Sequence, residues 1–394
     1  MRILMYGWEF PPFNSGGLGV ACEGIVNGLL RHNTKIHLVL PRAPQMKSEN
    51  FNIVDLSSNE DIEFTEINCP VLAYEGEHHY TQNLVNIKNA SMYGSDLFQE
   101  VERYSQLAGP MAAKHDHDII HAHDWLTYKA AINGKKISKK PFVAHIHATE
   151  LDRSGENPNP YIFELEKMGF EHADKIIAVS DYTKRKIVQH YKIPASKIEV
   201  VHNAVTKNFK QYQTKNFKES AKKVLFLGRV TMQKGPEYFL QAAAKVARFL
   251  PETVFLMAGT GDMLGRMIHL THDLGIDRNV LFTGFLRGAD IDRAFQNADL
   301  FVMPSVSEPF GLVALESIQN GTPVLVSNQS GVSEVIPNML KVDFWDTDEM
   351  ANKIVATLKY EPMNHDLINL SKRDLNNLEW HDQALKIKNI YTTL

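Results

Sequence analysis

Short runs of aliphatic and β-branched residues alternate with amphipathic stretches along the chain. Each apolar run in the first half is nearly continuous, as expected for parallel strands that helices cover on both faces. Segments with helical spacing, such as residues 18–32 and 182–190, lie between the runs. The alternation predicts βαβ units in an open, doubly wound α/β sheet. The predicted strands are residues 3–6, 36–40, 119–121, 142–146, 175–179 and 198–201.

A second series of apolar runs follows a polar stretch that has no apolar period, residues 206–222. It predicts strands at 223–227, 254–258, 280–282, 300–303 and 324–327, and helices at 236–249, 265–274, 291–298, 311–320 and 348–358. A last helix is predicted at 380–391 from its apolar spacing. We therefore predict two Rossmann-like domains, residues 1–205 and 223–378, joined by a linker at 206–222. Because such sheets bind ligands outside the carboxyl ends of their strands, we expect a ligand in a cleft between the domains.

The composition excludes some classes of function. The chain has 394 residues and a formal net charge of −4, which argues against a nucleic-acid partner because phosphate contacts need a basic surface. The two cysteines, Cys22 and Cys69, form neither a disulfide framework nor a metal-binding spacing. The N-terminus has no signal-peptide pattern, and no apolar run approaches the ~18–20 residues of a membrane span. We expect a cytoplasmic protein without an integral membrane segment, and peripheral membrane contact stays open.

A glycine-rich segment, NSGGLG at 14–19, follows the first predicted strand and opens the first predicted helix. Glycines allow close backbone approach, and a helix N-terminus favours an anion. Gly16 and Gly17 are therefore candidate phosphate or sugar contacts. The alternative interpretation is a mobile glycine loop without a ligand.

A basic segment, GRVTMQKGP at 228–236, lies between a predicted strand and a predicted helix. Arg229 follows the strand, and Lys234 precedes the helix. Two cations beside a helix N-terminus can bind a diphosphate. The alternative is a solvated basic loop, since lysine and arginine are common in loops.

An acidic segment, SVSEPFGLVALE at 305–316, spans the next such junction. Glu308 falls in the loop, and Glu316 falls on the helix. A carboxylate can accept both hydrogen bonds from a ribose diol, and a loop carboxylate can orient sugar hydroxyls. The alternative makes Glu308 an acid that complements the helix dipole, but it leaves Glu316 unexplained among apolar neighbours.

Four histidines cluster in the segments HAHDW at 121–125 and HIH at 145–147. The HxH pattern raises the question of zinc, but the chain has no HExxH, no CxxC and no carboxylate at a typical spacing, so we expect no metal site. His145 is expected in the core as a satisfied strand residue. His147 falls at the carboxyl end of a predicted strand and is the better candidate for a ligand contact.

These motifs together resemble glycosyltransferase family four, and in particular the bacterial and archaeal glycogen (starch) synthases. The most specific element is the Glu-x7-Glu of Glu308 and Glu316, preceded by Arg229 and Lys234. The segments 9–19 and 121–125 look more like glycogen synthases than like other members, and residues 379–394 look like the family's closing helix, which packs back toward the N-terminal domain. The resemblance covers nearly the whole chain. It implies a GT-B fold and an enzyme that needs no cofactor.

The resemblance implies a retaining, metal-independent transferase that moves a hexose from a nucleotide sugar to a glycan or other hydroxyl acceptor. Glucose from ADP-glucose or UDP-glucose is the expected donor group. The resemblance implies that Arg229 and Lys234 stabilise the leaving diphosphate, and that Glu308 and His147 contact the transferred sugar. The remaining implied substrate contacts are Glu316 at the ribose, Gly16, Gly17, Asp124, Ser330 and Gly331.

Two positions depart from the glycogen-synthase pattern. Asn14-Ser15 stands where those enzymes usually have Lys-Thr before the glycines, and Ala204 stands where a glycine is common. A transferase of mannose or another hexose to a lipid, glycan or small molecule therefore stays open. A non-catalytic sugar-nucleotide-binding module is an alternative from another class. NAD-dependent oxidoreduction is not favoured, because the dinucleotide glycine fingerprint is missing.

Overall fold

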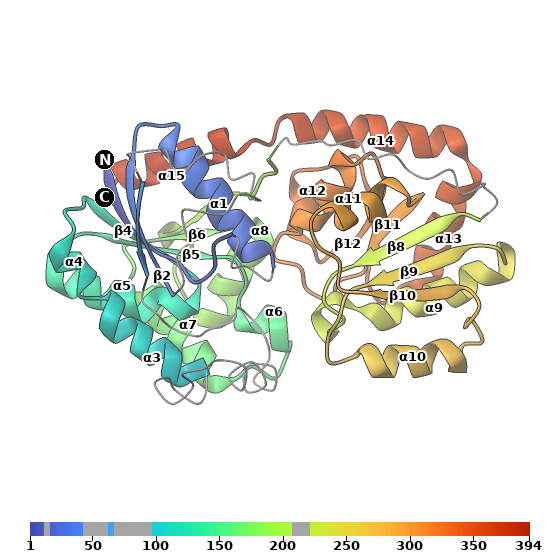
Figure 1. The fold of residues 1–394 in the computed structure, drawn as a ribbon, viewed down its shortest axis with the longest axis horizontal. Helices are drawn as coiled ribbons and strands as arrows, with labels where there is room; N and C mark the ends of the chain where they lie inside the picture. Colours follow the sequence, from blue (N-terminus) through green and yellow to red (C-terminus); the bar gives the residue numbers. More distant parts are fainter. Residues whose placement is uncertain (12–15, 42–61, 67–96, 207–220) are drawn as a thin grey trace. The chain divides into compact units, whose positions relative to one another are not determined.

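The computed structural model describes residues 1–11, 16–41, 62–66, 97–206 and 221–394. The chain divides into two compact units, which Figure 1 draws in sequence colours. Unit 1 comprises Met1–Glu150, Pro158–Ala204 and Trp380–Leu394, and unit 2 comprises Leu151–Asn157 and Val205–Glu379. The short segment Leu151–Asn157 thus packs with unit 2 although it precedes the predicted domain boundary at residue 205. Most of the predicted linker, 207–220, lies outside the described residues.

Unit 1 contains a parallel sheet in the order β3-β2-β1-β4-β5-β6-β7. The central strands are buried along their length, which explains their continuous apolar runs. The order reverses between β1 and β4, so the switch point of the sheet lies there. The strands are β1 Arg2–Tyr6, β2 Lys35–Leu40, β3 Ile62–Glu66, β4 Ile119–His123, β5 Phe142–Ile146, β6 Lys175–Ala178 and β7 Ile198–Val200.

Unit 2 repeats this plan with a parallel sheet in the order β10-β9-β8-β11-β12-β13. Its switch point lies between β8 and β11. One apolar core surrounds Phe239, Phe255 and Leu300, all fully buried. Both units are doubly wound, which confirms the predicted fold class. The strands are β8 Lys223–Leu227, β9 Val254–Ala258, β10 Val280–Gly284, β11 Leu300–Met303, β12 Val324–Ser327 and β13 Leu340–Val342.

Helices connect the strands within each unit (Figure 1). In unit 1 they are α1 Gly17–Leu30, α3 Leu97–Ala108, α4 Met111–Lys114, α5 Trp125–Ser138, α7 Pro160–His172, α8 Asp181–Lys186 and α15 Trp380–Thr392. In unit 2 they are α9 Pro236–Phe249, α10 Leu264–Asp273, α11 Ala289–Gln296, α12 Leu312–Gln319, α13 Thr347–Lys359 and α14 Glu361–Asn376. The short α6, Glu150–Ser154, begins at the last residue of a unit 1 segment and continues into unit 2.

The last helix, α15, packs on α1 of unit 1. Gly24 and Gly28 make this close approach possible. A Cβ on Gly24 would lie 2.1 Å from Trp380 Cε2, and one on Gly28 would lie 2.6 Å from the Trp380 carbonyl oxygen. The backbones could not come this near with larger residues at these two positions.

Two sequence predictions need correction. The strand predicted at 119–121 runs on to His123, so His123 lies within β4 and not after it. The helix predicted at 182–190 is α8 followed by a π-helical turn, Ile187–Tyr191. In the first case, alternating histidines hid a strand whose side chains are all buried, because polarity was taken as the end of the strand.

Candidate active site

Three of the candidate residues of unit 2 lie on two loops at the switch point of its sheet. Arg229 and Lys234 follow β8, and Glu308 follows β11. Because β8 and β11 are parallel neighbours, their carboxyl ends open at the same edge. The sequence placed these residues some 75 positions apart, and the topology brings them together.

Lys234 and Glu308 form an ion pair. The Lys234 Nζ lies 2.6 Å from Glu308 Oε2, with side-chain exposures of 20% and 8%. The Ser305 hydroxyl donates to the same carboxylate oxygen at 3.2 Å. A carboxylate this well buried needs such partners. The lysine and the serine therefore fix the position of the Glu308 carboxylate, which accepts hydrogen bonds from both.

Gln233, which the sequence analysis did not select, ties the two loops together. Its Nε2 donates to the Ser307 carbonyl at 3.1 Å, and its own carbonyl accepts the Val306 N–H at 2.9 Å. Its Oε1 accepts from Arg229 Nη2 at 3.2 Å. The buried amide thus orients the exposed arginine and fixes the loop that carries Glu308.

The backbone of Glu308 is held by the loop after β12 Val324–Ser327. The Glu308 N–H donates to the Gln329 carbonyl at 2.9 Å, and its carbonyl accepts the Gly331 N–H at 3.0 Å. Ser330 is buried, and its hydroxyl lies 2.9 Å from that of Ser327. The predicted contacts Ser330 and Gly331 therefore adjoin Glu308.

Two glycines with positive φ shape these loops. Gly235, with φ +63°, precedes α9, and a Cβ there would lie 2.2 Å from the Pro304 carbonyl oxygen. Gly311, with φ +106°, precedes α12, and a Cβ there would lie 3.2 Å from Glu308 Cγ. A side chain at Gly235 would collide with the backbone of Pro304, one at Gly311 would crowd Glu308, and both positions have left-handed backbone that favours glycine.

Glu316 lies on α12 and is half-buried. Burial and, secondarily, the nearby Asp292 carboxylate raise the pKa of Glu316 to about 7. Among the described residues its carboxylate accepts no hydrogen bond, whereas Asp292 accepts one from Asn320 Nδ2 at 3.1 Å. A partly buried carboxylate without a donor can accept two hydroxyl groups from a ligand.

The unit 1 candidates lie at the carboxyl edge of the other sheet. Gly16 caps α1 after β1, and Gly17 is the first residue of that helix; both are exposed. Asp124 adopts φ +58° between β4 and α5. Its Oδ1 accepts the His147 N–H at 2.6 Å, so it fixes the backbone of the residue that follows β5. These positions surround the switch point between β1 and β4.

Four histidines lie together at the ends of β4 and β5: His121, His123 and His145 within the strands and His147 directly after β5. The parallel register sets His123 opposite His145, and residues two apart share a face. The His123 Nδ1 lies 2.9 Å from His147 Nε2, and His121 Nε2 lies 3.3 Å from His145 Nδ1. The His121 Nδ1 in turn lies 2.5 Å from the hydroxyl oxygen of Tyr391 on α15, so Tyr391, His121 and His145 form a second hydrogen-bonded series.

Burial lowers the pKa of every imidazole in this histidine cluster, to about 3 for His121. The rings are therefore neutral at pH 7. His145 is a core residue as expected, but its Nε2 has no partner within the described chain, so it is not fully satisfied.

Two groups of side chains in this region bring possible metal-ligand atoms within 4.8 Å of one another: Cys22, His123 and His147, and His121, His123 and His145. The linear spacing did not reveal this clustering. Burial first, and then Asp124 and Glu9, raise the pKa of Cys22 well above its usual value, which disfavours a thiolate ligand. In the second group, His121 Nε2 and His123 Nδ1 already contact other histidines.

Two family models match consecutive parts of the chain. The model described as "Glycosyltransferase Family 4" covers residues 15–209, and the model described as "Glycosyl transferases group 1" covers residues 208–374. The chain belongs to glycosyltransferase family 4. It has the GT-B fold of that family, and the resemblance noted in the sequence is confirmed.

Two proteins are similar to this chain in sequence, and a third shares its fold. An uncharacterized glycosyltransferase of Methanocaldococcus jannaschii is 28% identical over 99% of this chain and 98% of its own length. A glycogen synthase of Mycobacterium tuberculosis is 27% identical over 86% of this chain and 80% of its own length. The solved structure of Anabaena Alr3699/HepE in complex with UDP and glucose superposes with a TM-score of 0.69, covers all of both chains and is 18% identical.

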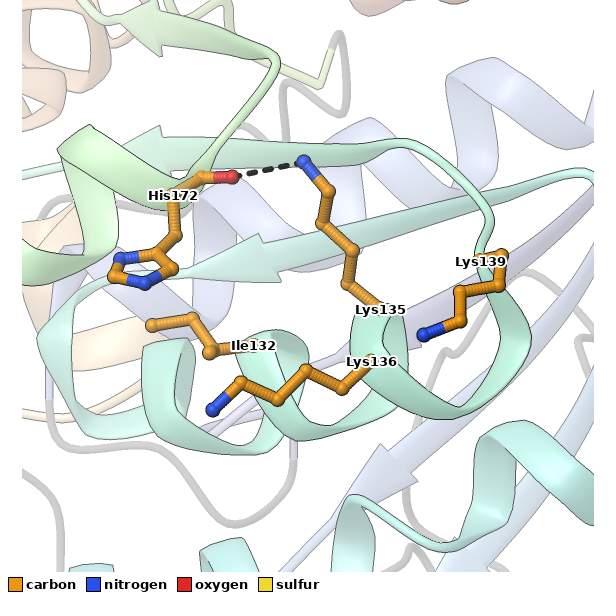
Figure 2. Close-up of a pocket in the computed structure, with 5 residues that line it drawn as sticks. All are labelled: Ile132, Lys135, Lys136, Lys139 and His172. Carbon is orange, nitrogen blue, oxygen red and sulfur yellow. Dashed lines mark hydrogen bonds between the residues drawn. The ribbon is translucent and has the colours of Figure 1, made fainter.

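A separate pocket of about 320 Å³ lies in unit 1 of this glycosyltransferase, at the edge of the sheet where the parallel strands begin. Figure 2 shows that lysines from the end of α5 line it, together with Ile132 and His172. The helix α5 starts at the carboxyl edge of the sheet and ends before β5 begins, so the pocket lies at the opposite edge from His147. Lys135 already pairs with Asp174 at 2.7 Å, and lysines at a helix C-terminus complement the dipole.

Across the described part of the chain, no helix is both long and apolar enough to cross a membrane.

The sequence analysis missed two residues that support the site in unit 2, Gln233 and Asp152. The Ser307 hydroxyl donates to Asp152 Oδ1 at 2.5 Å. Gln233 lies inside the basic segment 228–236 but was not selected, Asp152 lies outside every motif, and each acts through a contact across the fold.

Proposed function

We propose that this glycosyltransferase moves a hexose, in the first instance glucose from ADP-glucose or UDP-glucose, to a glycan acceptor. The reaction retains the configuration at the anomeric carbon and uses no metal ion. The similarity to a glycogen synthase over most of both chains supports the sugar and the acceptor class. The fold that the chain shares with a protein bound to UDP and glucose supports a nucleotide-sugar donor.

The contact that carries the proposal is the ion pair between Lys234 and Glu308. When the bond between the sugar and the β-phosphate breaks, negative charge develops on the leaving diphosphate. Lys234 and Arg229, which lie beside the N-terminus of α9, stabilise that charge. The incoming phosphate competes with Glu308 for Lys234 and leaves the Glu308 carboxylate to accept the sugar hydroxyls.

Glu316 binds the ribose of the donor. Its carboxylate lies in the second turn of α12, has no hydrogen-bond donor among the described residues, and is partly desolvated. Both ribose hydroxyls can donate to the two carboxylate oxygens, which offsets part of that desolvation. Ser330 and Gly331, on the loop bonded to Glu308, complete the donor contacts in unit 2.

Unit 1 contributes neutral groups. His147 contacts the transferred sugar, and Asp124 holds its backbone. Gly16 and Gly17 at the start of α1 present backbone N–H groups to substrate. These groups bind hydroxyls without adding charge, so the cations of unit 2 remain the main stabilisers of the leaving group.

The proposed step forms one bond and breaks one. The acceptor oxygen bonds to the anomeric carbon on the face from which the diphosphate departs, and the bond between that carbon and the β-phosphate oxygen breaks. The acceptor's proton passes to the departing phosphate oxygen. No side-chain base is needed, and configuration is retained.

A donor screen tests this proposal. Purified protein is heated with ADP-glucose, UDP-glucose, GDP-mannose or UDP-N-acetylglucosamine, because a ligand that binds the folded state raises the melting temperature with its concentration. Transfer to a glucan is then followed by NMR, which reports the anomeric configuration of the product. A glucose donor and an α-linked product support the proposal, whereas an inverted product contradicts it.

The same screen separates a second candidate, the transfer of mannose or another hexose to a lipid, glycan or small molecule. Asn14-Ser15 in place of the usual Lys-Thr removes a cation from the glycine segment and favours this alternative. Preferential stabilisation by GDP-mannose would support it. Stabilisation by a donor that is neither transferred nor hydrolysed would indicate a binding module.

A further inference from the structure

Trp345 differs from the other tryptophans of this chain in its exposure. Its relative exposure is 58%, whereas Trp8, Trp125 and Trp380 are 8% exposed or less. Covering an indole removes a large apolar surface from water, so tryptophan is usually well buried. The Trp345 indole N–H also has no acceptor among the described residues. The side chain thus offers both an open apolar surface and a hydrogen-bond donor to a ligand.

The loop that carries Trp345 lies at the same sheet edge as Glu308. It joins β13 to α13, at residues 343–346. Because β11, β12 and β13 are parallel neighbours, this loop starts two strand spacings, about 10 Å, from the end of β11. Gln329 links the two loops: its carbonyl accepts the Glu308 N–H at 2.9 Å, and its Nε2 donates to Asp343 Oδ1 at 2.9 Å. A short oligosaccharide is long enough to span the distance between them.

Contacts on both sides hold the indole in place. Hydrogen bonds from Gln329 and Asn328 lower the pKa of the Asp343 carboxyl, which is therefore ionised at pH 7. The Phe344 ring meets the indole at 85° with centroids 4.8 Å apart, and it meets the Tyr238 ring of α9 at 65° and 5.0 Å. A ring that is ordered before binding loses little further conformational entropy when a ligand packs on it.

The charges beside the indole select the class of ligand. Asp343 and Asp346 flank Trp345 in the loop, and neither pairs with a cation within the described chain. Two carboxylates disfavour an anionic ligand such as a nucleotide or a phospholipid. A pyranose is neutral, has a face of C–H groups that packs on an aromatic ring, and has hydroxyls that can donate to a carboxylate.

We propose that Trp345 is a binding site for the glycan acceptor, on which one pyranose ring of the chain packs while the chain end reaches the reacting centre. This inference rests on the proposed function for the acceptor class, and it adds a contact outside the groups assigned to the donor. Such a site raises the affinity for a long glycan without taking part in the reaction, because a second contact on one molecule acts through its effective concentration.

Electrophoresis in gels that contain glycogen tests this site without any transfer. We expect Trp345→Ala to weaken glycogen binding on the order of tenfold, and Trp345→Phe to stay within about threefold of wild type. The matched control is Phe249→Ala, since Phe249 is 69% exposed at the end of α9, at the opposite edge of the same sheet. Wild-type protein that does not bind glycogen would overturn the proposal, as would equal binding by wild type and Trp345→Ala.

Steady-state kinetics separate this site from the reacting centre. Trp345→Ala should raise the KM for glycogen about tenfold, while kcat and the KM for maltose stay within about twofold, because a disaccharide is too short to occupy both places. Equal changes in KM for the two acceptors would overturn the proposal, and so would an oligomer that dissociates on substitution of Trp345. If the protein binds glycogen through Trp345 but transfers no sugar, the proposed function fails and the binding site stands.

Discussion

The two units of this glycosyltransferase use the same sheet edge in opposite electrostatic ways. In unit 1, buried imidazoles contact one another and stay neutral. In unit 2, an ammonium group pairs with a carboxylate at the edge of the sheet, beside an exposed guanidinium. Under the proposed function, the neutral imidazole of His147 contacts the transferred sugar, and the cations of unit 2 stabilise the leaving diphosphate. The difference in charge between the two sheet edges follows from the burial of the histidines and the pairing of Lys234 with Glu308.

The units should respond to pH in opposite directions, and this is the largest expected effect. Folding lowers the pKa of these histidines below the value near 6.5 that they have in the unfolded chain. Because only the unfolded chain then binds protons as the pH falls below 6.5, acid lowers the free energy of unfolding. From pH 7.5 to pH 5, His121 alone should cost unit 1 about 2 kcal/mol, and His123 and His145 act in the same direction. Hydrogen-exchange mass spectrometry should show unit 1 peptides losing protection in acid. Unchanged protection in unit 1 would contradict the neutral histidine cluster.

Loss of the Lys234 cation should have the next largest effect. Lys234→Ala should lower kcat roughly 10²–10³-fold, the cost of removing one preorganised charge-stabilising donor. Lys245→Ala is the matched control, because Lys245 of the same unit pairs with Asp348 at 2.6 Å on α13. Steady-state kinetics of the two variants measure the difference. Equal activities would leave Lys234 as a structural partner of Glu308.

Glu316 should make donor binding pH-dependent. With its pKa near 7, the carboxylate is mostly protonated at pH 6, so donor affinity should fall about tenfold between pH 8 and pH 6. Titration calorimetry measures this directly. Asp292→Asn should move the midpoint to lower pH, since Asp292 raises the pKa of Glu316.

The same raised pKa has a consequence for stability that runs against that of the histidines. A carboxyl whose pKa rises on folding destabilises the native state as pH increases from its unfolded value through the folded one. Glu316→Gln should therefore stabilise unit 2 more at pH 8 than at pH 5 while weakening donor binding. A variant that is less stable at both pH values would contradict the assignment of Glu316 as an unpaired ligand contact.

Substitution of Gln233 should have the smallest effect on activity. Gln233→Leu removes the amide that links Arg229 to the Ser307 carbonyl and should lower kcat about tenfold or less. Gln296→Leu is its control, since that amide pairs with Asn320 at 2.7 Å on neighbouring helices of the same unit. If both variants kept wild-type kcat, Gln233 would not position the arginine.

The sequence predicted the inner strands because parallel strands covered on both faces are continuously apolar, but it missed the edge strands β3 and β13. It selected loop residues of unit 2 because they lie between such a strand and the next helix, and their roles stay predictions. It failed where polar side chains face inward. His123 was read as part of a loop although it is a buried strand residue, and periodicity cannot recognise a histidine that pairs with another one.

Support residues were also beyond the sequence. Gln233 and Asp152 act through hydrogen bonds to a loop more than 70 positions away. Neither its residue type nor its spacing distinguishes such a residue from the many polar residues on loops, because the contact exists only once the sheet has formed.

Transfer without a metal ion tests the central claim most directly, namely that Lys234 and Arg229 supply the charge for the leaving diphosphate. Wild-type protein is assayed with its glucose donor in excess EDTA and again in magnesium chloride, at equal ionic strength. The account predicts the same rate in both, because fixed cations act in place of a metal. Loss of transfer in EDTA that magnesium or manganese restores would contradict it.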